Sequence, residues 1–134
     1  MTTEPGAVWK TYNEAENARD FDAMVRLIAK DLRVTVNGAC AVGSAEDDER
    51  AMRHLIAIYP DYRRDIEEVV SAGNRAIARW RMVGTAGVAT TPNLNVPGCS
   101  IVTVADGRIT EAHLYYQGAA LDAVLHAAAV RSTP

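Results

Sequence analysis

Apolar side chains recur at helical spacing through most of the first 60 residues. Apolar positions three and four apart form stripes that predict helices over about 5–18, 20–29 and 44–59. Pro5 suits the first turn of the first helix, because a proline at that place gives up no hydrogen bond. Pro60 ends the third helix, because it cannot continue the hydrogen-bond ladder. The pattern therefore predicts three helices in this part of the chain.

The third predicted helix begins with a cluster of acidic residues. Ser44 followed three positions later by Asp47 resembles a capping box, with Asp in place of the usual Glu or Gln. Negative charge in the run 46–49 favours a helix N-terminus, where the backbone N–H groups are unpaired. This interpretation assigns the acidic run to helix initiation and predicts no catalytic or binding role for it.

Short β-branched and alternating runs predict strands in the rest of the chain. The predicted strands are 32–36, 66–71, 75–83, 100–105 and 108–117. The pairs Gly73-Asn74 and Asp106-Gly107 join consecutive strands, because both tolerate the positive φ values of a tight hairpin. Connections this short do not allow parallel crossovers, so we expect a mainly antiparallel sheet with helices packed on one face. The predicted fold class is α+β.

Two further segments complete the prediction. Residues 84–98 are rich in Gly, Pro, Thr and Asn, which is typical of a long loop or lid. The alanine-rich segment 119–130 is predicted to be a terminal helix. A chain of 134 residues that is 49% hydrophobic suits one core, so residues 1–134 are expected to form a single domain.

Charge and composition argue against several classes of protein. The net charge is −3 and basic residues occur singly, so no basic stripe suggests binding to nucleic acid. No apolar run approaches the roughly 20 residues that cross a bilayer, and the polar, acidic N-terminus does not resemble a signal peptide. We therefore expect a cytoplasmic protein with no membrane partner. Cys40 and Cys99 allow a disulfide, but reduced thiols are expected in that compartment.

Familiar cofactor and nucleophile motifs are missing from the sequence. It contains no P-loop, no GxSxG and no CxxC, and its three histidines are scattered. The GxxG of Gly84–Gly87 precedes no predicted helix, so loop glycines explain it. We therefore expect neither a cofactor nor a metal.

Polar side chains gather on one face of the last predicted strand. Alternate residues there are Ile109, Glu111, His113, Tyr115 and Gln117. If the helices cover this face, it lines a pocket; otherwise it is solvated or contacts a second subunit. In a pocket, Glu111 would orient His113 as a general base, whereas the simpler interpretation is a surface carboxylate and a structural histidine.

Two arginines share one face of a neighbouring strand. Arg79 and Arg81 lie on one side of it, while Trp80 lies on the other. Arginines on strands usually face solvent or form surface ion pairs, but inside a pocket they would bind an enolate, carboxylate or phenolate oxygen.

The chain resembles the nuclear transport factor 2-like superfamily, and within it the SnoaL-like polyketide cyclases. The resemblance rests on Tyr12 five residues before NARDFD, on PDY at 60–62 and on VADGRITEAHLYYQGAAL at 104–121. It covers nearly the whole chain, but its motifs are diffuse and speak more for the fold than for the function. It implies a curved sheet wrapped around N-terminal helices, a cone-shaped pocket, and often a dimer through the outer sheet face.

The chain departs from the pattern of its relatives at several pocket positions. SnoaL-like cyclases carry a catalytic Asp where this chain has Gln117, and a Gly-Thr-His-x-Gly where it reads Gly84-Thr85-Ala86-Gly87. Ketosteroid isomerases match at the oxyanion-hole phenol, Tyr12, whereas their base and acid fall at Val36 and near Ser100. The resemblance thus implies a retained pocket with replaced chemistry.

Epoxide hydrolases similar to limonene-epoxide hydrolase also share this fold. They match at Arg79, but this chain has Arg81 and Gln117 where their two acids belong. The resemblance therefore does not support their hydrolytic mechanism.

Two hypotheses follow for the function. The first is a cofactor-free cyclase, isomerase or related enzyme acting on a hydrophobic polyketide- or steroid-like molecule, which Gln117 grips without taking its proton. Its candidate catalytic residues are Tyr12, Arg79, His113 and Gln117, and its candidate substrate-binding residues are Trp9, Val36, Asn37, Arg81, Ser100 and Tyr115. The second is a non-catalytic binding or dimerisation module. A homodimer is expected in either case.

Overall fold

The computed structural model of the protein describes residues 4–118. Along the chain the elements are α1 (Pro5–Asn17), α2 (Phe21–Arg26), β1 (Ile28–Val36), β2 (Ala39–Val42), α3 (Ala45–Ile58), β3 (Arg63–Ala72), β4 (Arg75–Gly84), β5 (Leu94–Ala105) and β6 (Arg108–Tyr116). The helix predicted over 119–130 lies outside the described residues.

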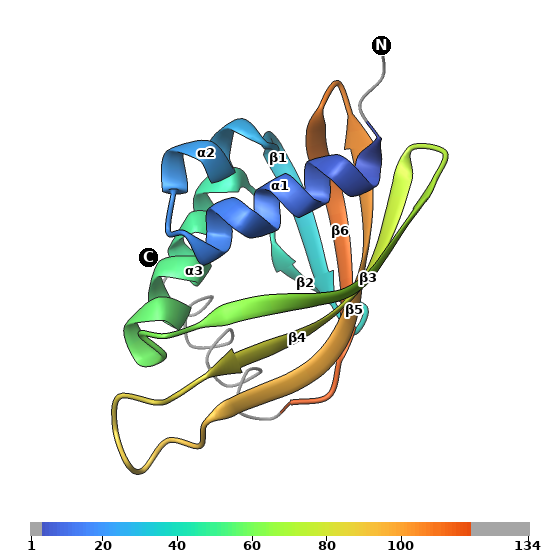
Figure 1. Ribbon diagram of the computed structural model, residues 1–134. Coiled ribbons are helices and arrows are strands. Elements are labelled where there is room, and N and C mark those ends of the chain that lie inside the picture. The colour runs from blue at the N-terminus through green and yellow to red at the C-terminus, as the bar shows by residue number, and fades with distance from the viewer. Residues whose placement is uncertain (1–3, 119–134) are drawn as a thin grey trace.

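The six strands form one curved, unclosed sheet that the helices cover on its concave side (Figure 1). The strand order is β2-β1-β6-β5-β4-β3, and every neighbouring pair is antiparallel except β1 and β6. α1 crosses the concave face, and α3 packs against β1 and β2 (Figure 1). This confirms the α+β fold with a mainly antiparallel sheet, and leaves an interior between the sheet and the helices.

The first two helices and the start of the sheet follow local signals only in part. The carboxylate of Asp20 caps α2 by accepting a hydrogen bond from the backbone N–H of Ala23. The helix was expected to continue to about residue 29, but it ends at Arg26 and β1 begins two residues later. The backbone N–H of Ile109 donates to the carbonyl of Leu27, so pairing with β6 draws this segment into the sheet.

The predicted long loop is shorter than expected, because β5 begins at Leu94 and runs through the Pro- and Gly-containing segment. Its residues pair with β4 as far as Gly84. Gly98 is a close-approach glycine here, since a Cβ on it would lie 2.6 Å from the Trp80 ring. The Pro and Gly residues that suggested a loop therefore lie within a strand, where Gly98 lets the Trp80 ring pack closely against the backbone.

Bulges in β3 and β6 change which face of the sheet their side chains occupy. In β6 the register changes so that Glu111 pairs with Thr103 while Ile109 pairs with Val104, which adds one residue to β6. In β3 a similar shift occurs between Ile66 and Glu68. One extra residue moves every later side chain of that strand to the opposite face of the sheet. These shifts decide which residues reach the interior.

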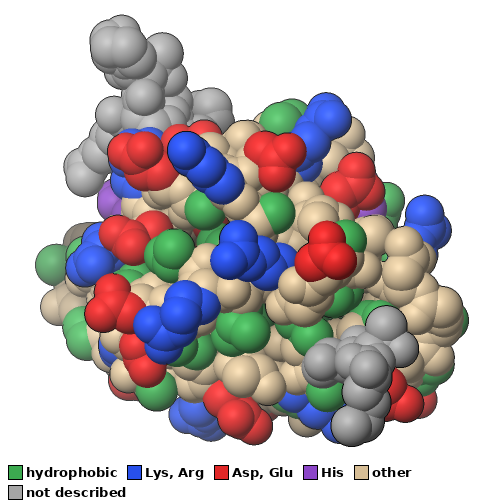
Figure 2. Space-filling model, turned by 90° about the horizontal axis from the view of Figure 1, so that it is seen from above, with side chains coloured by type: hydrophobic (Ala, Val, Ile, Leu, Met, Phe, Trp, Pro, Cys, Tyr) green, Lys and Arg blue, Asp and Glu red, His purple; other side chains and the backbone are tan. Residues whose placement is uncertain are grey.

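Basic and acidic side chains are interspersed on the face seen in Figure 2. Cys40 and Cys99 are free thiols in the structure. None of the helices in the described part of the chain is long and apolar enough to cross a membrane.

Candidate functional site

A pocket lies between the inner face of the sheet and the helices α1 and α3, with a cavity volume of about 110 Å³. Most of its wall is aliphatic and comes from β1, α3 and the inner faces of β4, β5 and β6. Its polar or charged lining residues are Tyr12, Glu16, Asp47, Asp48, Arg50, Arg64 and Ser100. Asp47 and Arg50 have side chains about 40% exposed, so the pocket borders solvent beside the start of α3.

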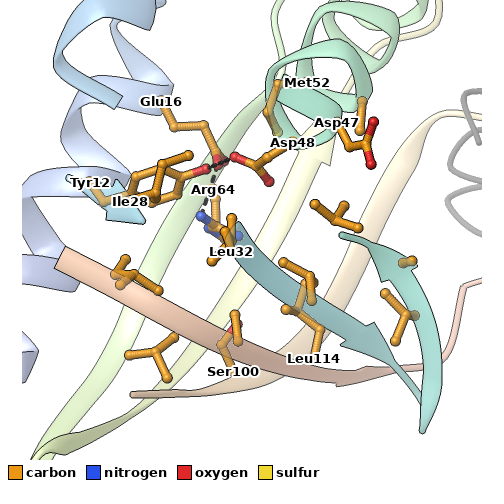
Figure 3. A pocket seen from close by; sticks show the side chains of 18 of the residues that line it. Tyr12, Glu16, Ile28, Leu32, Asp47, Asp48, Met52, Arg64, Ser100 and Leu114 are labelled. Atoms are coloured by element: carbon orange, nitrogen blue, oxygen red, sulfur yellow. Dashed lines mark hydrogen bonds and ion pairs between the residues drawn. The ribbon is translucent and has the colours of Figure 1, made fainter. Parts of the chain in front are cut away.

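A phenol and a carboxylate meet inside this pocket. Tyr12, on α1, donates a hydrogen bond of 2.7 Å from its Oη to Oδ2 of Asp48, in the first turn of α3 (Figure 3). Ser44 caps α3 by accepting from the N–H of Asp47, and its carbonyl accepts from the N–H of Asp48. The cap fixes where the helix begins, and so places Asp48 facing α1.

The neighbouring carboxylate behaves differently. Asp47 points away from Asp48 and pairs with Arg50 at 2.9 Å (Figure 3). Two adjacent acidic residues thus have separate surroundings, because successive helical positions differ by about 100° around the axis.

The surroundings of Asp48 favour its neutral form. Burial raises the pKa of its carboxyl from 3.8 to about 6, and the charge of Glu16 adds to this rise, while the hydrogen bond from Tyr12 and the charge of Arg64 oppose it. Burial and the nearby carboxylates raise the pKa of the Tyr12 phenol, so Tyr12 keeps its proton at neutral pH. The pair therefore contains an acid that titrates near neutrality and a phenol that does not.

A buried ion pair lies beside the Tyr12–Asp48 pair (Figure 3). Nη2 of Arg64, on β3, is 3.0 Å from Oε1 of Glu16 on α1, and both side chains are almost fully buried. The hydroxyl of Tyr62 donates to the other oxygen of Glu16 at 2.8 Å, and Nε of Arg64 donates to Oδ1 of Asn13 at 2.7 Å. Burial, the largest single effect, opposes the charge on Arg64, but Glu16 together with Tyr62, Tyr12 and Asp48 outweighs it and raises the pKa of the guanidinium, which stays charged.

Two indole rings hold the guanidinium in place. The Cζ atom of Arg64 lies 5.2 Å from the ring centroid of Trp9 and 5.7 Å from that of Trp80. Nε1 of Trp80 in turn donates to the hydroxyl of Ser100 at 2.9 Å. Arg64 is therefore a rigid, buried cation on the pocket floor.

Four of the residues predicted from the sequence line the pocket: Trp9, Tyr12, Val36 and Ser100. Asn37 is a correction, because it lies in the turn after β1 with a φ of 51° and is not part of the lining. Its side chain accepts from the N–H of Tyr116 and donates to its carbonyl. This residue ties β1 to the end of β6.

The polar residues of β6 are a second correction. The bulge turns Ala112 and Leu114 into the pocket, so His113 and Tyr115 lie on the outer face. His113 is hydrogen-bonded there to Thr35 at 2.7 Å, and its Nε2 lies 3.6 Å from Glu111. Gln117 is exposed and is not among the lining residues.

The two strand arginines are a third correction. Arg79 and Arg81 lie on the outer face of β4, opposite Trp80, and do not line the pocket. Arg79 forms ion pairs with Glu67 and Glu68, and Arg81 lies 3.6 Å from Glu67. Like most arginines on strands, they face solvent and form surface ion pairs, because a charged group is more stable in contact with water.

Sequence reasoning missed the charged residues that do reach the interior, namely Glu16, Asp48 and Arg64. A signal was present for two of them. Glu16 follows Tyr12 by four positions, and Asp48 precedes Met52 by four, so each carboxylate continues an apolar stripe. Arg64 lies outside the strand predicted over 66–71, so no pattern marked it.

Comparison with known proteins places this geometry in a family. A sequence model of the SnoaL-like domain matches residues 9–112. No curated protein matches the chain. Among solved structures, IdmH from Streptomyces antibioticus, a proposed polyketide cyclase, superimposes with a TM-score of 0.77 at 20% identity, covering 92% of this chain and 99% of that one.

Other similar structures are those of proteins named for different activities. An epoxide hydrolase of M. tuberculosis, similar to limonene-epoxide hydrolase, gives a TM-score of 0.75 at 19% identity, with 96% of this chain and 94% of that chain covered. A proposed ketosteroid isomerase from Kribbella flavida gives 0.67 at 19% identity, with 86% and 78% covered. At such identities the likeness establishes the fold, and the activity has to be argued from the pocket.

Proposed function

The chain belongs to the family of SnoaL-like domains, and from this premise we propose that it is a proton-transfer enzyme of the cyclase or isomerase type. Its substrate is a small, largely apolar molecule, and Asp48 is the general base that removes a proton from one of its carbon atoms. The observation that carries this proposal is an Asp in an apolar pocket whose pKa is raised to about 6. No cofactor takes part in the step.

The pKa of Asp48 suits this role. A base acts best when its pKa lies near the working pH, because it is then ionised and still binds a proton firmly. At neutral pH most Asp48 side chains are carboxylates, and the aliphatic wall keeps water from weakening their basicity.

Tyr12 gives the pair two useful states. While Asp48 is ionised, the Tyr12 hydroxyl donates to it and fixes its orientation. Once Asp48 has taken a proton, the carboxylic acid can donate to the phenol oxygen, which frees the phenol hydrogen for an oxygen of the ligand. Tyr12 thereby supports both the base and the charge that develops on the substrate.

The reaction balances within the pocket. A C–H bond of the substrate breaks, its proton forms an O–H bond on Asp48, and the electron pair enters an enolate. The proton then returns to a different carbon in an isomerisation. In a cyclisation, the enolate carbon instead bonds to an electrophilic carbon, whose oxygen receives the proton from Asp48.

The size of the cavity limits what fits. A cavity of about 150 Å³ holds one benzene ring. The cavity of about 110 Å³ is smaller than this, so it encloses at most one ring, and a larger polyketide- or steroid-like molecule would extend past Asp47 and Arg50 into solvent.

The role of Asp48 can be tested with any simple ketone that has acidic α-protons. We expect the protein to accelerate exchange of the α-protons of the bicyclic ketone 2-tetralone in D₂O, followed by NMR, with a rate that rises through a pKa of about 6. Asp48→Asn should lower the accelerated rate by on the order of 10²–10⁴-fold, because an amide cannot accept the proton.

The adjacent residue provides a matched control. Asp47→Asn removes the same charge from the same helix turn, but Asp47 pairs with Arg50 and points away from Tyr12. It should leave the exchange rate nearly unchanged. Equal exchange by the wild type and Asp48→Asn would refute the proposal and leave a binding module as the function of this pocket.

A further inference from the structure

One nitrogen of the buried guanidinium has no hydrogen-bond acceptor within residues 4–118. Nε of Arg64 donates to Asn13 and Nη2 to Glu16, whereas Nη1 makes no hydrogen bond to any described residue. The Arg64 side chain is only 6% exposed and lines the pocket. A free N–H donor on a buried side chain that lines a cavity is suited to an acceptor on a ligand.

The position of this donor is rigid. Glu16 and Asn13 hold two of its nitrogens, and the rings of Trp9 and Trp80 flank the guanidinium. A donor that is already oriented stabilises developing charge without having to reorganise.

The distribution of charge specifies what kind of oxygen it would bind. Glu16 neutralises Arg64, so the remaining negative charge of these buried groups belongs to the ionised Asp48. When a substrate proton moves to Asp48, that negative charge moves to the substrate oxygen. An oxygen at Arg64 would gain charge in the transition state while the total charge of the pocket stays constant, and interactions that strengthen in this way accelerate the reaction.

We propose that Nη1 of Arg64 donates a hydrogen bond to the carbonyl oxygen of the substrate, while the C–H beside that carbonyl is presented to Asp48. This inference rests on the proposed function for the role of Asp48. It makes Arg64 a residue that binds the reacting oxygen as well as the partner of Glu16.

Binding of two molecules of the same shape tests the assignment without any turnover. 2-Naphthol presents an oxygen on a bicyclic apolar frame, like the enol of a ketone, and naphthalene lacks that oxygen. Calorimetric titration of the wild type should show 2-naphthol binding at least about tenfold more tightly, which is the lower end for a hydrogen bond to a charged group. Equal affinities would overturn the proposal.

Variants then identify the donor. Arg64→Lys keeps a positive charge for Glu16 but loses the Nη1 donor, so the preference for 2-naphthol should vanish while naphthalene binding persists. If this variant does not fold, the double variant Glu16→Gln with Arg64→Gln, which removes both buried charges, should show the same loss. A preference retained in a folded variant would place the oxygen elsewhere and contradict the assignment.

The two proposals fail separately. Asp48→Asn should keep the preference for 2-naphthol, because Arg64 and its partners are unchanged. A preference for 2-naphthol without any exchange of 2-tetralone would reject the role of Asp48 and support that of Arg64, and exchange without the preference would do the reverse.

Discussion

Asp48 shows how one side chain can combine a functional advantage with a cost in stability. Its folded-state pKa of about 6 lies above the value of an unfolded chain, so the folded protein binds its proton more tightly than the unfolded one. The free energy of unfolding therefore falls as the pH rises from about 4 through 6, and the ionised carboxylate is a burden at neutral pH.

Asp48→Asn should consequently stabilise the protein at pH 8 and have little effect at pH 3, where the carboxyl is mostly neutral in both states. The two-unit shift bounds the gain at about 3 kcal/mol, and the amide oxygen can still accept from Tyr12. Urea unfolding at the two pH values measures it. A variant less stable than the wild type at pH 8 would show that the carboxylate stabilises the fold.

Tyr12 adjusts the same group from the other side. Its hydrogen bond lowers the pKa of Asp48 against the effect of burial, so Tyr12→Phe should raise that pKa further above 6. The midpoint of the pH dependence of 2-tetralone exchange should move to higher pH. Tyr62→Phe is the control, because it removes a buried hydroxyl that is bonded to Glu16 and not to Asp48. An unchanged midpoint in Tyr12→Phe would contradict this coupling.

At the scale of elements, the start of α3 determines the position of the base. Ser44 accepts from the backbone N–H of Asp47, and the next residue along the helix is Asp48. The cap therefore links helix stability to the geometry of the pocket.

Ser44→Ala should destabilise the protein by about 1 kcal/mol and also lower the exchange rate, because the first turn of α3 loosens. Asp20→Ala is its counterpart, since Asp20 caps α2, which supplies no residue to the pocket lining. It should cost a similar amount of stability in thermal unfolding and leave exchange intact. Equal effects of both variants on the exchange rate would show that the Ser44 cap has no specific influence on the position of the base.

At the scale of the whole molecule, the outer sheet face carries apolar side chains among its ion pairs. Val70, Ile77 and Tyr115 are each between 44% and 48% exposed there. We propose that two copies associate through this face, since an association of this kind would remove those side chains from water.

Ile77→Glu should convert a dimer into a monomer, because it places a charge among the apolar side chains of the proposed interface, and light scattering would report the change in mass. Val88→Glu offers the control, since Val88 is 60% exposed but lies in the loop between β4 and β5. A wild type that is monomeric at micromolar concentration would refute the proposed dimer.

Much of this architecture follows from local signals. The stripes before residue 60, the two hairpin turns and the cap at Ser44 predicted three helices and an antiparallel sheet, because these signals act over a few neighbouring residues. The exact ends of α2 and β5 were not predicted, because pairing with distant strands satisfies their backbone groups.

The sequence by itself determined the fold class and the presence of an apolar interior, since helical and strand periodicities are properties of neighbouring residues. Only the tertiary structure decided which polar residues enter that interior. A one-residue bulge turned His113 outward, and the packing of α1 against α3 and β3 brought Asp48 to Tyr12 and Arg64 to Glu16. A strand's facing depends on its register, and a pKa depends on neighbours that are distant in the chain, so neither follows from local pattern.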